Sequence, residues 1–135
     1  MAGFGKEIRL KGSFEEIKAK VVDALKTQGF GILTEIDVQK TLKEKIDVAF
    51  EPYQILGACN PQLAHRALQA DKMIGLLLPC NVVIRAAGGS VAVSILDPEV
   101  MFSIVGPETK STLAALPGEA KGRLWAALAI LEEGS

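Results

Sequence analysis

The chain has 135 residues and a mass of 14.3 kDa, so we expect a single domain over residues 1–135. Apolar residues make up 49% and charged residues 23%, and 15 basic against 16 acidic side chains leave a net charge of -1. This composition excludes a disordered chain and argues against nucleic-acid binding, which needs a basic surface. Two cysteines and one histidine exclude a disulfide framework and an all-cysteine zinc site within one chain.

No targeting or membrane signal is found in the sequence. Residues 1–12 lack an apolar stretch long enough for a signal peptide. The most apolar segment, residues 73–84, is too short to span a bilayer and contains Pro79 and Asn81. We therefore expect a cytoplasmic protein with no membrane partner and with reduced thiols.

The N-terminal segment predicts a strand followed by a helix. Residues 4–11 alternate apolar and charged side chains, although imperfectly. Ser13 and Glu16 form a capping box, and apolar residues then recur at helical spacing. Gly29 suits the left-handed conformation that ends a helix, so the helix should reach about Gln28.

Two further pairs of a strand and a helix are predicted before residue 71. The strands are expected at residues 30–36 and 53–59, and the helices at residues 38–46 and 61–70. Asp37 can cap the first of these helices, which is short and lies on the surface. Asn60 followed by Pro61 is typical of the start of the second.

The segment from residue 73 to residue 96 is almost free of charge. Its one charged residue is Arg85, and the small residues 87–90 divide it into two strand-like runs, which predicts a central hairpin. Pro79 within the first run predicts an edge strand or a bulge just before Cys80. The lack of charge predicts strands covered by helices on one face and by a partner subunit on the other.

The C-terminal part is predicted to be helical. Asp97-Pro98 opens a short helical stretch, and a final helix follows Pro117-Gly118 with its apolar side chains on one face. Strands and helices are thus interspersed along the chain. We predict an α+β fold, with a mostly antiparallel sheet and helices packed on one face.

The two cysteines and the only two asparagines form two dipeptides, Cys59-Asn60 and Cys80-Asn81. Random placement would produce this roughly once in nine thousand arrangements, so coincidence is a poor explanation. Each dipeptide lies at the end of an apolar run. These four residues are therefore the main candidates for a binding or reactive site.

The dipeptides allow a structural and a functional interpretation. In the structural one, each asparagine bonds to the local backbone and each cysteine is a small buried apolar residue. In the functional one, Cys59 precedes a helix N-terminus that favours a thiolate, with further help from Asn81 or Arg85. If the two strands pair in register, Cys59 and Cys80 could also come within disulfide distance.

Other candidate chemistry is weaker. Glu35 and Asp37 could point together from a strand end, but solvated charges explain them better. Cys59, Cys80 and His65 match no standard zinc spacing, so we expect no metal site. The sequence contains no phosphate-binding or nucleophile-elbow motif, and we expect no cofactor and assign no catalytic residue.

Four stretches resemble one known family: residues 29–46, 53–68 and 74–84, and Asp97-Pro98. The chain resembles the bacterial and archaeal family catalogued as domain of unknown function 302, in order over about residues 13–105. The resemblance implies an α+β fold like that of the TATA-box-binding protein. It implies no DNA binding, because that function requires a basic sheet, and no established activity.

We therefore expect a small homodimeric module without enzymatic activity that binds a small ligand or a sulfur species near the Cys-Asn pairs. Two alternatives stay open. One is a thiol-dependent or redox enzyme that uses Cys59, with Asn60 and Asn81 as hydrogen-bond donors. The other is a structural interaction domain in which the dipeptides serve only the fold.

Overall fold

A five-stranded antiparallel sheet forms the centre of the computed structural model, which describes residues 3–134. In spatial order the strands are β1 (Gly5–Leu10), β5 (Ser90–Leu96), β4 (Cys80–Ala87), β3 (Tyr53–Cys59) and β2 (Gly31–Asp37). The α-helices are α1 (Phe14–Thr27), α2 (Val38–Ile46), α3 (Pro61–Ala70), α4 (Pro98–Met101), α5 (Pro107–Leu113) and α6 (Leu116–Glu133). Two 3-10 helices, η1 (Lys72–Leu77) and η2 (Phe102–Ile104), complete the described elements. The predicted α+β class with an antiparallel sheet is confirmed.

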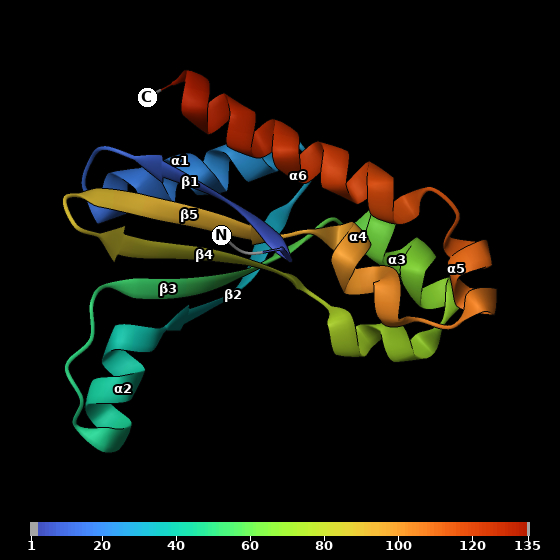
Figure 1. Ribbon diagram of the computed structural model, residues 1–135, viewed down its shortest axis with the longest axis horizontal. Coiled ribbons are helices and arrows are strands. Elements are labelled where there is room, and N and C mark those ends of the chain that lie inside the picture. Colours follow the sequence, from blue (N-terminus) through green and yellow to red (C-terminus); the bar gives the residue numbers. More distant parts are fainter. Residues whose placement is uncertain (1–2, 135) are drawn as a thin grey trace.

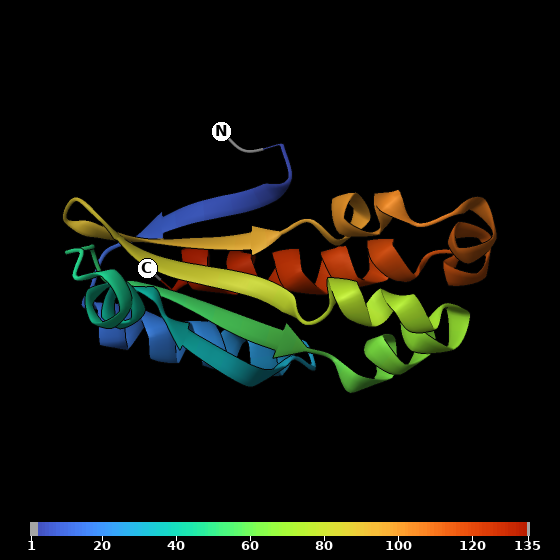
Figure 2. The ribbon, with the colours of Figure 1, turned by 90° about the horizontal axis from the view of Figure 1, so that it is seen from below.

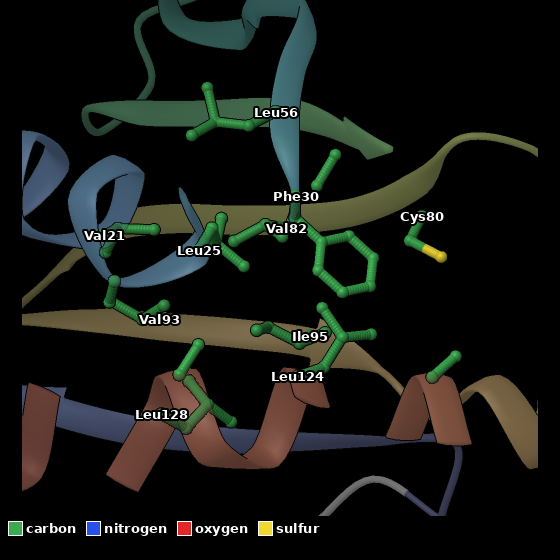
Figure 3. Close-up of a cluster of buried hydrophobic side chains, with 14 of the residues drawn as sticks. Val21, Leu25, Phe30, Leu56, Cys80, Val82, Val93, Ile95, Leu124 and Leu128 are labelled. Atoms are coloured by element: carbon green, nitrogen blue, oxygen red, sulfur yellow. The ribbon is translucent and has the colours of Figure 1, made fainter. Parts of the chain in front are cut away.

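Helices α1 and α6 cover one face of the sheet (Figure 1). Figure 2 views the opposite face, which these helices leave uncovered. The core lies between the helices and the covered face (Figure 3). Its fully buried side chains include Val21 and Leu25 of α1, Leu124 and Leu128 of α6, and Leu56, Val82 and Val93 of the sheet. Burying each such side chain stabilises the fold by about 1.5–3 kcal/mol.

Side-chain caps start the helices where the sequence predicted them. The Ser13 hydroxyl accepts a hydrogen bond from the Glu16 amide at 3.1 Å and donates one to its carboxylate. Asp37, Asn60 and Asp97 cap α2, α3 and α4 in the same way. The local polar pattern therefore determines these boundaries.

Residues 73–78 do not form a strand, contrary to the prediction. Residues 72–77 form η1, which is capped by Asp71, and Ile74 is its one buried residue. An apolar run of this length fits a strand and a helical segment equally well, so its pattern alone misleads.

Pro79 marks neither an edge strand nor a bulge in β4. It immediately precedes β4, which is the central strand of the sheet, so its missing N–H removes no bond from the ladder. The irregularity lies instead in β2, between Ile32 and Thr34.

Helix α2 departs from the one-sided arrangement of the other long helices. Figure 1 shows it beyond the ends of β2 and β3, on the side of the sheet opposite α1 and α6. None of its nine residues is buried within the described chain.

Gly57 permits a close approach between β2, β3 and the residue before β4. A Cβ at this position would lie 2.6 Å from Pro79 Cγ and closer still to Thr34 Oγ1. We expect Gly57→Ala to lower the free energy of unfolding by about 1–3 kcal/mol, because a well-packed site must shift to admit the methyl group. Urea denaturation measures the loss. Gly31→Ala in the same sheet is the matched control, since a Cβ there has no neighbour within 4 Å. Equal effects of the two substitutions would contradict this account.

Candidate functional site

A small pocket lies where β3 ends and β4 begins. Strand β3 continues into α3 through Cys59 and Asn60, while β4 starts at Cys80 on the neighbouring strand. The pocket has a volume of about 30 Å³. Residues from β3, α3, β4 and the C-terminal helices line it: Phe30, Ala58, Cys59, Asn60, Leu63, Ala64, Ala67, Leu78, Pro79, Cys80, Phe102, Leu116 and Ala120. It therefore brings together three of the four main candidate residues.

Both cysteines of the pocket are free, and their environment favours the protonated thiol. Cys80 is buried and Cys59 is half-buried. Burial raises the pKa of Cys80 to about 11, and the nearby Cys59 thiol contributes to that rise. Burial also raises the pKa of Cys59. The expected thiolate at the start of α3 thus has no support, because a helix dipole contributes only about 0.3–1 kcal/mol against desolvation.

The strand register does not align the two cysteines for a disulfide. Ala58, not Cys59, lies opposite Cys80 in the β3–β4 ladder. Because successive residues of a strand point to opposite faces, the ladder gives Cys59 and Cys80 no facing position.

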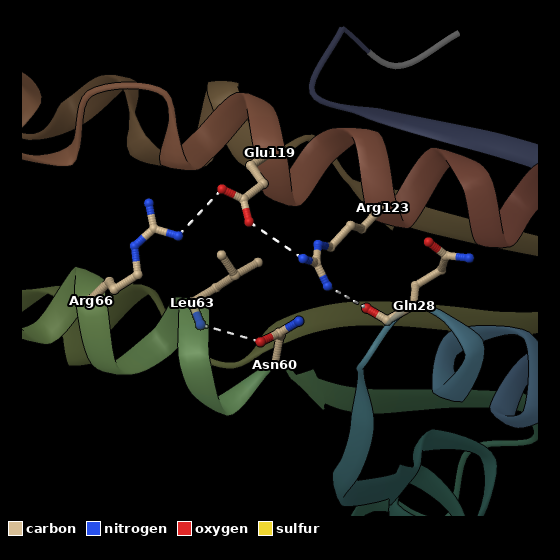
Figure 4. Close-up of polar contacts among 6 residues, drawn as sticks. All are labelled: Gln28, Asn60, Leu63, Arg66, Glu119 and Arg123. Atoms are coloured by element: carbon tan, nitrogen blue, oxygen red, sulfur yellow. Dashed lines mark hydrogen bonds and ion pairs between the residues drawn. The ribbon is translucent and has the colours of Figure 1, made fainter.

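Asn60 acts as the cap of α3. Its Oδ1 accepts a hydrogen bond from the Leu63 amide at 3.2 Å, and the residue is 7% exposed (Figure 4). Its Nδ2 lies so close to Gly29 that a Cβ there would approach it to 2.9 Å. Asn60 therefore joins the start of α3 to the turn after α1. The predicted cap is confirmed.

Three charged side chains lie beside Asn60, between α3, α6 and the end of α1. Arg123 of α6 donates to the Gln28 carbonyl oxygen and pairs with Glu119, which also pairs with Arg66 of α3 (Figure 4). These contacts connect α3 and α6 with the end of α1. Since Arg66 and Glu119 are solvent-exposed, their pairing contributes little to stability.

Asn81 lies away from the pocket. It is exposed and pairs with Gly57 in the ladder, between the inward-facing Cys80 and Val82. It is not among the residues that line the pocket. The two Cys-Asn pairs thus do not converge on one site as whole dipeptides.

The weaker candidates have other partners. Glu35 binds Lys18 of α1 at 2.6 Å, and Asp37 caps α2 by accepting from the Lys40 amide at 2.9 Å. Arg85 donates to Glu7 of β1 at 3.0 Å on the uncovered face of the sheet. None of these three residues lines the pocket.

Two features of the structure have no simple signal in the sequence. Phe30, Phe102 and Leu116 complete the pocket walls from distant positions in the chain. On the uncovered face, the Ser94 hydroxyl donates to Glu7 at 2.8 Å. This hydrogen bond and that from Arg85 lower the pKa of Glu7. The sequence points to this second feature only through Arg85, a single charge in an otherwise uncharged segment.

Within residues 3–134, no three His, Cys, Asp or Glu side chains gather closely enough to hold a metal ion. Over the same residues, no helix combines the length and the apolar character needed to cross a membrane.

The fold and the pocket define a small α+β domain with two free cysteines where β3 ends and β4 begins. The chain belongs to the family described as "Domain of unknown function DUF302", whose model matches residues 6–131. It is similar to a solved structure, the crystal structure of the uncharacterized conserved protein DUF302 from Bacillus stearothermophilus. The two chains are 28% identical with a TM-score of 0.84, and the match covers 96% of this chain and 99% of the other. No curated protein matches the chain.

The two asparagines should differ sharply in their contribution to stability. We expect Asn60→Ala to lower the free energy of unfolding by about 1–2 kcal/mol, because it removes a buried helix cap. Asn81→Ala is the matched control and should change it by less than about 0.5 kcal/mol, because the side chain is exposed. Thermal and urea unfolding of the two variants provide the comparison. A larger loss at Asn81 would be inconsistent with these roles.

The raised pKa of Cys80 should make stability depend on pH. Folding favours the protonated thiol, so its contribution is complete below pH 9 and is lost as the pH rises toward 11. A shift of this size corresponds to about 2–3 kcal/mol. We expect the wild type to lose more stability than Cys80→Ala between pH 8 and 11 in urea denaturation. Parallel curves for the two proteins would mean that Cys80 ionises as freely in the folded chain as in the unfolded one.

Proposed function

We propose that this chain is a homodimeric module without enzymatic activity that binds a small neutral sulfur compound in the pocket between β3, β4 and α3. One observation carries the proposal: two free thiols with raised pKa values line the same small apolar pocket.

The volume of the pocket limits the size of its ligand. About 30 Å³ is enough for one to three water-sized groups. A compound such as hydrogen sulfide or methanethiol is of this size. A nucleotide, a sugar or a peptide side chain would require the walls to move apart.

The walls favour a neutral ligand. No charged side chain is among the described residues that line the pocket. A charged ligand would therefore lose its hydration without gaining an ion pair, which costs several kcal/mol or more. Protonated Cys59 and Cys80 add no charge of their own at neutral pH.

The polar groups of the pocket favour sulfur over oxygen or nitrogen. Asn60 uses its Oδ1 to cap α3 and its Nδ2 lies against Gly29, and the other polar side chains that line the pocket are the thiols of Cys59 and Cys80. A thiol is a weak donor and a weak acceptor, so an alcohol or an amine would exchange strong bonds to water for weak ones. A sulfur compound loses less and gains contact with polarisable sulfur atoms.

The same features argue against the thiol enzyme. A nucleophilic cysteine needs a lowered pKa or an adjacent base, and burial shifts both thiols in the opposite direction. The one histidine, His65, is exposed on α3 and does not line the pocket. Binding without catalysis is therefore the better account.

Titration with methanethiol at pH 6.5 tests the proposal. We expect the NMR signals of the backbone amides of residues 58–64 and of Cys80 to shift. These shifts should reach a plateau as the methanethiol concentration rises. Methanol at the same concentrations is the control probe and should cause no saturable change.

Two matched variants locate the binding. Ala64→Leu places a larger side chain in the pocket wall and should abolish the response, while Ala19→Leu on the exposed surface of α1 should preserve it. The proposed ligand class is wrong if the wild type does not respond, or if Ala64→Leu responds like the wild type.

A further inference from the structure

We propose that a second copy of this chain covers the uncovered face of the sheet, related by a two-fold axis that runs across the strands. This inference rests on the homodimer of the proposed function and adds its surface and geometry. The uncovered face is defined here as the side chains of the sheet that point away from α1 and α6 (Figure 2).

Two rows of side chains near the middle of the strands cross this face from β2 or β3 to β1. The first row contains the successive register partners Ile36, Ile55, Val83, Ser94 and Glu7. The second contains Tyr53, Arg85, Ala92 and Arg9. Because the residues that alternate with these rows along the strands, such as Val82, Ile84 and Val93, belong to the buried core, both rows point to the uncovered side.

The face is divided into an apolar part and a charged part. Ile36, Ile55 and Val83 lie toward β2, and Ile36 is 48% exposed. Glu7 and Arg9 lie at the β1 edge, where the Arg9 side chain is 56% exposed. A contiguous apolar area beside a group of paired charges is typical of an interaction surface.

A two-fold axis across the strands makes this face complementary to itself. The axis passes between the two rows, so the first row of each copy lies over the second row of its partner. Arg9 then faces the partner's Glu7, and Tyr53 packs on the partner's Ile55. Arg85, which is paired with Glu7 of its own copy, lies over the partner's Val83.

An axis parallel to the strands would not achieve this match. It would place the β1 edge over the partner's β2, so that Glu7 lies over the partner's Ile36, and it would bring Arg85 of the central strand over the partner's Arg85. Charges buried against apolar side chains lose hydration without compensation. The charge pattern therefore selects one orientation for the second copy.

The helices at the two ends of the face extend the same surface. Figure 1 shows α2 and the yellow-green η1 on the uncovered side, at opposite ends of the strands. Ile46 of α2 is 63% exposed, and Met73 and Leu76 of η1 are 68% and 79% exposed. The proposed rotation brings α2 of each copy to the end where the partner's η1 lies. It thereby gives apolar contacts to a nine-residue helix that has no buried residue of its own.

The area agrees with that of a stable dimer. Five strands about 4.8 Å apart and about 20 Å long present roughly 500 Å². Helices α2 and η1 add about 250 Å² between them. The total is close to the roughly 800 Å² per partner of a standard interface.

Sedimentation equilibrium of the full chain tests this surface. The wild type should sediment at about twice 14.3 kDa. Val83→Arg places a positive charge at the centre of the face, over the partner's Arg85, and should give monomers with an unchanged circular dichroism spectrum. Arg9→Glu should raise the dimer dissociation constant at least about tenfold, because two contacts become repulsive. Ile130→Glu on α6, which is 40% exposed and away from this face, is the control and should remain dimeric.

The outcomes separate the two proposals. A monomeric wild type overturns both the homodimer and this surface. A wild-type dimer that persists in Val83→Arg and Arg9→Glu overturns the surface and leaves the homodimer standing. Dissociation of Ile130→Glu would also overturn it, because an effect outside the face would show that the substitutions are not specific.

Discussion

The pairing of β3 with β4 in a single register determines where the two Cys-Asn dipeptides lie. Leu56 and Ala58 of β3 face the helices together with Cys80, Val82 and Ile84 of β4, and all of them are buried. A shift of either strand by one residue would expose that strand's core side chains, so burial holds the register. The same constraint places Cys80 in the pocket and Asn81 on the opposite face. The structural separation of two adjacent residues thus follows from the parity of one strand.

Local signals were the part of the fold that the sequence revealed best. Ser13, Asp37, Asn60 and Asp97 each satisfy an amide of a helix's first turn, a short-range interaction that depends on few other residues. The run from residue 73 to residue 78 was wrongly predicted as a strand, because its apolar side chains follow neither the two-residue period of a strand nor the 3.6-residue period of a helix. Pro107 lies in the first turn of α5, a short helix that precedes the predicted final helix.

The candidate site was predictable as a set of residue types and not as a geometry. Pairing of the cysteines with the asparagines drew attention to residues 59, 60, 80 and 81, and three of them line one pocket. Which asparagine would be left out depends on the register of the sheet, which two dipeptides cannot specify. The effect of the environment on the thiols also depends on long-range packing, since Phe30, Phe102 and Leu116 come from elsewhere in the chain. A thiolate at Cys59 was one of two interpretations of the sequence, because only the helix start was visible there.

Strand β4 connects the two proposed surfaces. Its residues alternate between the pocket side, with Cys80 and Val82, and the uncovered face, with Val83 and Arg85. As the central strand it is hydrogen-bonded along both edges, so it moves together with β3 and β5 rather than alone. The pocket is so small that a ligand larger than a few atoms would have to displace Cys80 or the start of α3. In the proposed dimer such a displacement would shift Val83 and Arg85 against the partner, and the rigidity of the paired sheets would oppose it. Dimerisation and the selection of a small ligand would therefore depend on the same strand.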